Sequence, residues 1–292
     1  MFIPNDYKNL IEVKKNKSYR MAFLEIIEYA LTKFIEDKNM FELSDFSYIY
    51  CDEYVLKTNC HKDLFSTLYI LIDQPFNYKT ELLIKKNKSK KNKITMPELY
   101  NPLDKIKEEL YQIFVNYLDS NCLLWQSNNT ISIRTAIPDT NDNEAFYINI
   151  IPTIAHYNDN NNIGFMYEKN GEIEIEYPDL LVKNFNKKNK QTKDKYRQTI
   201  VIFKNILLRD EKINSLPSEI IETILYNVPN SLFEDDSQSS LIKIINFIRN
   251  NNLQDFLTID EQDKAFTSRY RSMSSFYVKH ILKIIENYLS KI

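Results

Sequence analysis

Apolar residues recur every three or four positions in several stretches of the chain, and this spacing predicts amphipathic helices. These stretches are residues 18–37, 102–118, 194–209, 217–226, 238–249 and 272–289. Other stretches are rich in β-branched and aromatic residues and end near proline, glycine or polar clusters, which is typical of strands. They are residues 46–56, 66–73, 131–137, 145–154 and 172–176. The order predicts a mixed α/β region followed by an all-helical region.

Two basic segments lack this periodicity. Residues 183–192 follow Pro178 and are predicted to be a polar connector that leads into the next helix. Residues 85–93 contain six lysines and no apolar residue. We interpret them as a solvated loop, because such a composition cannot bury enough apolar surface to pack. A loop that contacts phosphates is the alternative.

Composition narrows the class of protein. With 292 residues and 43% hydrophobic residues, the chain can build a full core. The net charge of −2 argues against bulk electrostatic attraction to nucleic acid. No apolar run is long enough to span a bilayer, and the N-terminus does not resemble a secretory signal. Cys51, Cys60 and Cys122 have no disulfide or zinc spacing, so we expect free thiols in a cytoplasmic protein without membrane partners.

Glycine content excludes two classes of nucleotide-binding enzyme. Gly164 and Gly171 are the only glycines. A dinucleotide-binding G-x-G-x-x-G motif and a Walker-type phosphate loop both need several glycines for close backbone approach. Neither motif is present.

Other chemically reactive residues give weak signals. His61, His156 and His280 are scattered without metal-ligand spacing. Alternate positions of a strand share one face, so the glutamates of residues 172–176 could bind a divalent ion. Because Ile173 supplies the opposite face, we interpret these glutamates as the solvated side of an edge strand, with metal binding as the alternative.

Several motifs point to a known family. Asn149 lies in the apolar run Phe146-Tyr-Ile-Asn-Ile-Ile-Pro152, where a buried amide would need hydrogen-bond partners. This run and four downstream segments resemble motifs of the bacterial cGAS/OAS-like (CD-NTase-like) nucleotidyltransferases. The downstream segments are Tyr177-Pro178, residues 184–192, residues 196–205 and residues 216–230. The resemblance covers roughly residues 20–250.

The resemblance implies an α+β fold of the nucleotidyltransferase (polymerase-β-like) type. Residues 1–178 would form a mixed-sheet lobe with an N-terminal helix. Residues 179–292 would form a helical lobe, with a cleft between the two lobes. The resemblance also implies nucleoside triphosphates as ligands, cyclic or linear nucleotides as products, and a role in antiviral signalling.

The catalytic positions of the family are altered in this chain. In the family, an Asp-x-Asp on one strand and a third Asp on a later strand bind two magnesium ions, which stabilise the attacking and leaving oxygens of phosphoryl transfer. The resemblance places Thr67 and Tyr69 at the first two positions and Asn149 at the third. None is a carboxylate, so we expect no catalytic residue, no metal site and no cofactor. Mg²⁺ is expected only if Asp63 or Asp73 serves instead.

Lys57 and Thr58 stand at the places of the Gly-Ser turn that holds the donor phosphates in the family, so this turn is altered, and they stay candidate nucleotide contacts. Two positions further along the chain match the family more closely. Lys204 matches a helix lysine that approaches donor phosphates. Ser218 matches a phosphate-contacting serine at the start of the next helix, where backbone N–H groups also favour an anion. The alternative is a surface lysine and a helix cap.

Three functional hypotheses follow. The first is a catalytically inactive relative that binds a nucleoside triphosphate or an oligonucleotide as a sensor, or that binds another protein. The second is an active, metal-dependent nucleotidyltransferase with different carboxylates. The third is a scaffold that recruits RNA or a protein partner through its helical lobe or its basic loops.

Overall fold

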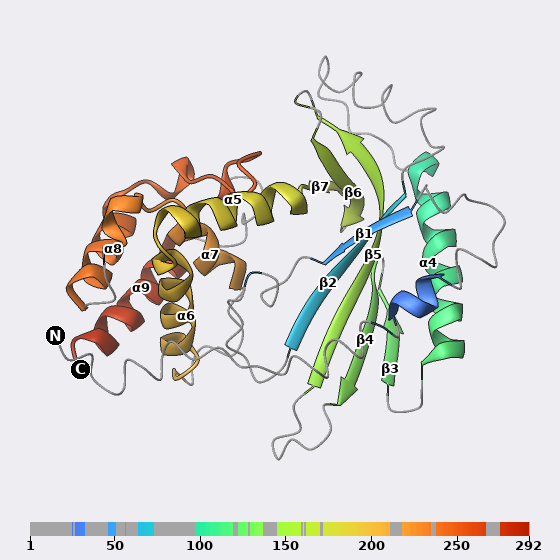
Figure 1. Ribbon diagram of the computed structural model, residues 1–292, viewed down its shortest axis with the longest axis horizontal. Helices are drawn as coiled ribbons and strands as arrows, with labels where there is room; N and C mark the ends of the chain where they lie inside the picture. Colours follow the sequence, from blue (N-terminus) through green and yellow to red (C-terminus); the bar gives the residue numbers. More distant parts are fainter. Residues whose placement is uncertain are drawn as a thin grey trace. The chain divides into compact units, whose positions relative to one another are not determined.

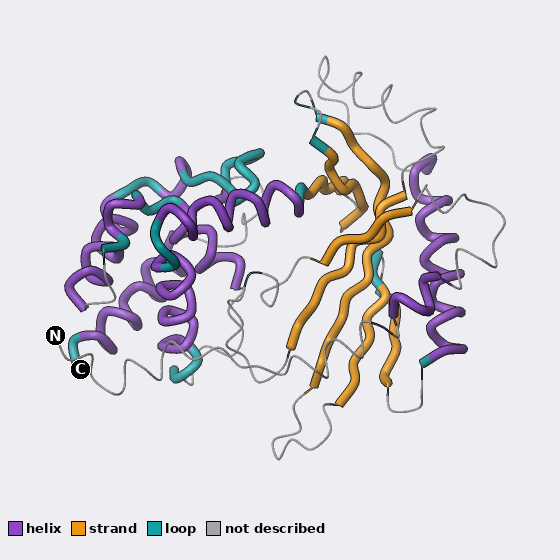
Figure 2. The backbone as a smooth tube through the Cα atoms, in the orientation of Figure 1, coloured by secondary structure: helices purple, strands orange, loops and turns teal. Residues whose placement is uncertain are grey.

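The structure divides into two compact units. The computed structural model of the protein describes residues 25, 27–32, 46–50, 56, 64–72, 97–118, 122–127, 129–136, 145–158, 160, 162–169, 172–210, 218–234, 238–266 and 275–291. The first unit holds the described residues from 25 to 178 except Leu56, and the second holds Leu56 and those from Asp179 onward. The named strands all belong to the first unit, whereas the second consists of helices and loops (Figure 2).

The described strands of the first unit form one seven-stranded sheet (Figure 1). They are β1 (Phe46–Tyr50), β2 (Leu64–Ile72), β3 (Cys122–Gln126), β4 (Ile131–Ala136), β5 (Ala145–Tyr157), β6 (Ile163–Lys169) and β7 (Glu172–Glu176). The order is β1-β2-β5-β4-β3, and β6 pairs with both β5 and β7. The β2/β5 pair is parallel and the other pairs are antiparallel. The predicted mixed sheet is confirmed, although β3 and β6 were not among the predicted strands.

The long strand β5 organises this sheet because it has three neighbours. Along one edge it pairs with β2, and along the other it pairs first with β4 and then with β6. Pairing with β4 ends at Ile150, and pairing with β6 begins at Ile154. Pro152 lies in this interval, so its missing N–H leaves no gap in either antiparallel ladder. A proline in the middle of a strand is tolerated here for that reason.

Helix α4 (Pro97–Tyr117) covers one face of the sheet (Figure 1). Its Leu110 and Phe114 are fully buried in one cluster with strand residues such as Ile133 and Ile148. Ile27 and Ala30, from the helical residues 25 and 27–32, belong to the same cluster. The N-terminal helix is thus confirmed within the described residues. The helix predicted from Pro102 begins earlier, at Pro97, where the fixed φ of proline suits a first turn.

The second unit contains five named α-helices within its described residues. They are α5 (Pro178–Gln191), α6 (Lys195–Leu207), α7 (Ser218–Tyr226), α8 (Gln238–Asn250) and α9 (Ser275–Leu289), with the short 3₁₀ helices η2 (Asn230–Leu232) and η3 (Leu253–Asp255). The four helices predicted from residue 194 onward are confirmed, with ends shifted by a few residues. Among the described residues, none of the helices has the length and apolar character needed to cross a bilayer.

The predicted connector at residues 183–192 is wrong, because helix α5 runs through Gln191. The polar composition suggested solvent exposure, yet Lys188 and Asn189 are only 7% and 6% exposed. The Lys188 ammonium donates hydrogen bonds to the carbonyl oxygen of Val228 at 2.7 Å and to Oδ1 of Asn230 at 3.0 Å. These partners satisfy a cation that would otherwise be costly to bury.

Three aromatic rings complete the surroundings of this ammonium. Its Nζ lies 5.6 Å from the ring centroid of Tyr196, 5.5 Å from that of Tyr226 and 5.2 Å from that of Phe233. Rings within about 6 Å attract a cation through their quadrupole. Lys188 therefore joins α5 to α6, to the end of α7 and to the segment after η2.

Candidate functional site

The three positions that the family resemblance assigns to the catalytic aspartates lie on one face of the sheet, opposite α4. Thr67 on β2 is the register partner of Asn149 on β5, and Tyr69 lies two residues after Thr67 on the same face. The intervening Leu68 and the neighbouring Ile148 point to the α4 side, where both are fully buried. The sheet thus brings a hydroxyl, a phenol and an amide to one face.

Asn149 is exposed, so its side chain is not the buried amide that its apolar neighbours suggested. The hydroxyl of Ser132 on β4 donates a hydrogen bond of 2.8 Å to its Oδ1. Ser132 and Asn149 are register partners in the antiparallel β4/β5 pair. The strand alternation, rather than the local sequence, decides which face the amide occupies.

Tyr69 reaches a carboxylate from another strand. Its hydroxyl donates to Oε2 of Glu176, and the hydroxyl of Tyr167 donates to Oε1 of Glu176 at 2.7 Å and to Oε2 of Glu174 at 3.2 Å. The Tyr69 side chain also packs edge-on against Phe165, with ring centroids 5.9 Å apart. Two phenols thus direct their hydrogen bonds to the β7 glutamates.

The interpretation of the β7 glutamates as a solvated edge is corrected by these contacts. Glu174 and Glu176 are half-buried and accept hydrogen bonds from Tyr69 and Tyr167. The strand prediction itself is confirmed. Sequence reasoning missed these contacts because β6 and β2, which carry the tyrosines, approach β7 only in the folded sheet.

The described side chains of this face do not fit a two-magnesium site. Positions 67, 69 and 149 offer no carboxylate, and the glutamates beside Tyr69 already accept phenol hydrogen bonds. Across the part of the chain that the structure describes, no group of three His, Cys, Asp or Glu residues could hold a metal ion. Asp63 and Asp73, the alternative ligands, lie outside the described residues.

The helical unit holds the two nucleotide-contacting candidates that the structure describes. Lys204 lies on α6 and is 3% exposed, and its Nζ donates to Oε1 of Glu222 on α7 at 2.7 Å. Ser218 is the first residue of α7 and is buried, one helical turn before Glu222. Contact of either residue with a phosphate stays a prediction. Lys204 would have to share its charge between Glu222 and that phosphate.

The structure describes only some of the other residues that were considered from the sequence. Lys57, Thr58 and the basic segment 85–93 lie outside the described residues, as do His61, Cys51 and Cys60. His156 on β5 is half-buried, and this burial lowers the pKa of its imidazole. His280 is exposed on α9, and Cys122 on β3 is half-buried against the α4 core.

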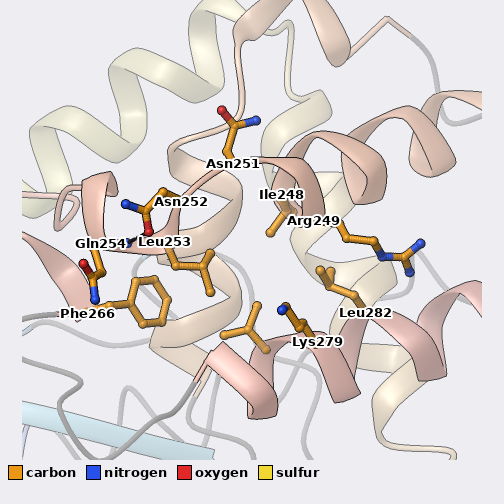
Figure 3. A pocket seen from close by; sticks show the side chains of 10 residues that line it. Ile248, Arg249, Asn251, Asn252, Leu253, Gln254, Phe266, Lys279 and Leu282 are labelled. Carbon is orange, nitrogen blue, oxygen red and sulfur yellow. Dashed lines mark hydrogen bonds between the residues drawn. The ribbon is translucent and has the colours of Figure 1, made fainter.

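A pocket of about 400 Å³ is formed within the helical unit (Figure 3). Its floor is apolar and its rim carries amides and two cations. The lining residues are Ile248, Arg249, Asn251, Asn252, Leu253, Gln254, Phe266, Val278, Lys279 and Leu282. Neither Lys204 nor Ser218 is among them. This pocket is therefore separate from the predicted phosphate contacts.

Part of the chain is similar in sequence to known nucleotidyltransferases. Residues 183–290 match the family model described as the cGAS/DncV-like nucleotidyltransferase C-terminal helical domain. The cyclic UMP-AMP synthase of Rhodothermus marinus is 28% identical over 117 residues, or 39% of this chain and 41% of that relative. The cyclic nucleotide synthase CdnE01 of Staphylococcus haemolyticus is 34% identical over 114 residues, or 36% and 38% respectively. The chain thus spans less than half the length of these curated relatives.

Solved structures match over nearly the whole chain. The structure of Rhodothermus marinus CdnE c-UMP-AMP synthase with Apcpp and Upnpp has a TM-score of 0.72 at 17% identity and covers 100% of this chain and 97% of that one. The structure of Elizabethkingia meningoseptica CdnE with GTP and Apcpp has a TM-score of 0.71 at 18% identity and covers 99% of each chain. The chain therefore has the α+β fold of the CdnE nucleotidyltransferases, and its residues 183–290 are similar to the C-terminal helical domain of the cGAS/DncV-like family.

Proposed function

We propose that this protein is a catalytically inactive relative of the CdnE cyclic nucleotide synthases that binds a nucleoside triphosphate or an oligonucleotide. It would act as a sensor or as the partner of another protein. The observation that supports this proposal is the shared sheet face of Thr67, Tyr69 and Asn149, which offers no carboxylate where phosphoryl transfer needs paired metal ions.

Nucleotide binding is proposed from the helical unit. The Lys204 ammonium and the start of α7 at Ser218 are a cation and a set of helix N-terminal N–H groups, and both favour phosphate oxygens. Solved structures of fold relatives hold nucleotides or their analogues, namely Apcpp with Upnpp and GTP with Apcpp. Binding without transfer is the combination that the described residues support best.

Turnover is tested with labelled nucleoside triphosphates and Mg²⁺ or Mn²⁺, with and without single- and double-stranded nucleic acid. We expect no nucleotide product under any of these conditions. The proposed inactivity would be contradicted if a nucleotide product forms in the presence of metal and the activity per amount of protein stays constant through further purification. The same assay on Asp63→Ala and Asp73→Ala would then show which of these residues is a ligand.

Binding is tested by calorimetry with a non-hydrolysable triphosphate. Lys204→Ala combined with Ser218→Ala should abolish binding. The matched control is Lys243→Ala combined with Ser239→Ala, which removes one lysine and one serine from α8 and should leave binding unchanged. Because Lys204→Ala leaves Glu222 buried without its lysine, Lys204→Met combined with Glu222→Leu is a second variant that removes the cation in a neutral pair. Undiminished affinity in both Lys204 variants would refute the assigned contact.

An active nucleotidyltransferase is the second candidate, and one observation favours it. Glu176 accepts a hydrogen bond from Tyr69, and Glu174 shares the Tyr167 hydroxyl with Glu176, so two carboxylates are near the position of one aspartate of the family. If the protein turns over triphosphates, Glu174→Gln and Glu176→Gln should lower the rate by at least about 100-fold. Unchanged turnover in both variants would remove these glutamates from consideration.

A further inference from the structure

The edge strand β3 exposes two large apolar side chains. Leu123 is 56% exposed and Trp125 is 43% exposed. Their neighbours Cys122 and Leu124 point the other way and pack on the α4 core. Leu123 and Trp125 therefore lie on the face opposite α4, which is the face of Thr67 and Asn149.

Strand register aligns Trp125 with the polar side chains of this face. Trp125 is paired with Ser132, Ser132 with Asn149, and Asn149 with Thr67. One row of side chains thus crosses four neighbouring strands, a span of about 14 Å at the usual strand spacing. The row begins with an indole and continues with hydroxyl, amide and hydroxyl groups.

A second row beside the first supplies a cation. Leu123 is paired with Arg134, and Arg134 with Tyr147. The Arg134 Nε donates to the Tyr147 hydroxyl at 2.9 Å, and its Cζ lies 5.6 Å from the ring centroid. The guanidinium is half-buried and held in place by this phenol. We call the two rows together the open face.

The chemistry of the open face favours one kind of ligand. Its exposed groups include the Trp125 indole and the Asn149 amide, and the Arg134 guanidinium is half-buried. The Ser132 hydroxyl is buried and holds the amide by its hydrogen bond, and none of the named residues is a carboxylate. Glu174 and Glu176 lie further along the sheet, where they accept hydrogen bonds from Tyr69 and Tyr167. An apolar protein partner would bury the positive charge of Arg134, whose hydrogen-bond partner Tyr147 is a neutral phenol, and burying a charge in this way is unfavourable. Unpaired nucleobases offer a stacking face to Trp125 and hydrogen-bonding edges to Asn149, and their phosphates suit Arg134.

We propose that the open face is a stacking platform for a single-stranded oligonucleotide, with Trp125 as its aromatic contact and Arg134 as its cation. This inference rests on the proposed binding function and names the ligand class. Bases inside a duplex have no free faces, so the platform selects single strands over double strands. The 14 Å row is several times the rise of about 3.4 Å between stacked bases, so the face contacts more than one nucleotide.

The test uses the fact that Trp125 is the only tryptophan in the chain. The whole protein is titrated with a 12-nucleotide oligo(A) RNA while tryptophan fluorescence is followed. Saturating quenching is expected, because stacking brings a base against the indole. A duplex of the same length should produce no comparable change. Binding of labelled oligo(A), seen by fluorescence anisotropy, without any change in the tryptophan signal would overturn the proposal.

Substitutions test which residues of the open face contact the oligonucleotide. Trp125→Leu keeps an apolar side chain but removes the π-face, and it should weaken binding of labelled oligo(A) by about 5- to 150-fold. Trp125→Phe should weaken it less, and Leu208→Ala, which removes an exposed leucine of the helical unit, should leave it within about twofold. Arg134→Gln should reduce the slope of log affinity against log salt by about one. Equal affinity in wild type and Trp125→Leu would refute the stacking role.

Failure of the platform and failure of the proposed function are distinguishable. If calorimetry shows triphosphate binding but oligo(A) leaves Trp125 unaffected, the platform is refuted and nucleotide binding stands. If sedimentation shows a dimer that Trp125→Leu dissociates, and oligo(A) does not bind, the open face is a contact between two copies of the chain. Quenching by oligo(A) together with nucleotide turnover would support the platform and refute inactivity.

Discussion

The hydroxyl of Ser132 donates a hydrogen bond of 2.8 Å to the amide oxygen of Asn149, across two neighbouring strands of the open face. A carboxylate oxygen would accept the same hydrogen bond. Position 149 is therefore compatible with aspartate as well as with asparagine. The hydrogen bond from Ser132 would hold either side chain in the same place on this face.

Introducing carboxylates at positions 67, 69 and 149 together should create a metal site. In Thr67→Asp/Tyr69→Asp/Asn149→Asp, carboxylates on one face repel one another until a divalent cation binds. We expect Mn²⁺ to raise the melting temperature of this variant and not that of the wild type. At an ion concentration of about 100 times the dissociation constant, the stabilisation is about 2.7 kcal/mol. Thermal unfolding with and without Mn²⁺ measures it.

The control for this experiment is Thr67→Asn/Tyr69→Asn in the Asn149 background, which places three uncharged amides of similar shape on the same face. It should show no response to Mn²⁺. An equal response in the control would mean that the ion binds elsewhere. No response in the triple aspartate variant, if it is folded, would mean that this face cannot assemble a metal site.

Breaking the buried ion pair should cost far more than breaking an exposed one. Lys204→Met leaves the 4% exposed Glu222 without its lysine, which should lower the free energy of unfolding by about 3–5 kcal/mol. Lys204→Met combined with Glu222→Leu should recover most of this loss. Lys243→Met, at the exposed pair with Glu234, should cost less than about 1 kcal/mol. Urea denaturation measures the free energy of unfolding of the three variants. If all three lose less than about 1 kcal/mol, the charge of Lys204 is not required for stability.

Helix periodicity predicted the helical unit well because its apolar stripes pack within that unit. Ile200, Ile220, Ile244 and Ile281, one from each of four helices, are all buried in its core. Such stripes are visible locally, since residues three and four apart share a helix face. The order of strands around β5 could be expected only through the resemblance, because register depends on partners far apart in sequence.

The surroundings of several individual side chains could not be predicted from the sequence. Lys188 is buried because a carbonyl, an amide and three aromatic rings converge on it from residues 196–233. The alignment of Trp125 with Ser132 depends on the β3/β4 register, which joins residues seven positions apart on different strands. The partners of Glu176 come from β2 and β6, which no local pattern connects. Composition gives the type of a side chain, whereas its surroundings depend on contacts distant in sequence.

Gly164 should not tolerate a side chain. A Cβ built there would lie 2.6 Å from Cγ2 of Ile175 and 2.9 Å from Cε1 of Tyr177. Ile175 is branched at Cβ and cannot swing away freely. Gly164→Ala should therefore lower the free energy of unfolding by about 1–3 kcal/mol, as overpacking does. In Gly164→Ala/Ile175→Ala the nearer contact is relieved, so urea denaturation should show a smaller cost than the sum of the two single changes.

The environment of Lys188 should make stability rise with pH. Burial lowers the pKa of its ammonium to about 8, from an ordinary value of 10.5. Between these two values the unfolded chain binds more protons than the folded chain, so the free energy of unfolding increases as pH rises. From pH 8 to 9.5 the contribution of Lys188 is about 1–2 kcal/mol. Urea denaturation at several pH values in this window measures it.

Lys188→Met is the control, because it keeps a long side chain among Tyr196, Tyr226 and Phe233 but cannot titrate. The difference in unfolding free energy between wild type and Lys188→Met should shift in favour of the wild type as pH rises from 8 to 9.5. The window ends below pH 10 because burial raises the pKa of both Tyr196 and Tyr226. Above pH 10 these tyrosines ionise more readily in the unfolded chain, which lowers stability. A wild-type and variant difference that stays constant across the window would show that Lys188 titrates at its ordinary pKa in the folded protein.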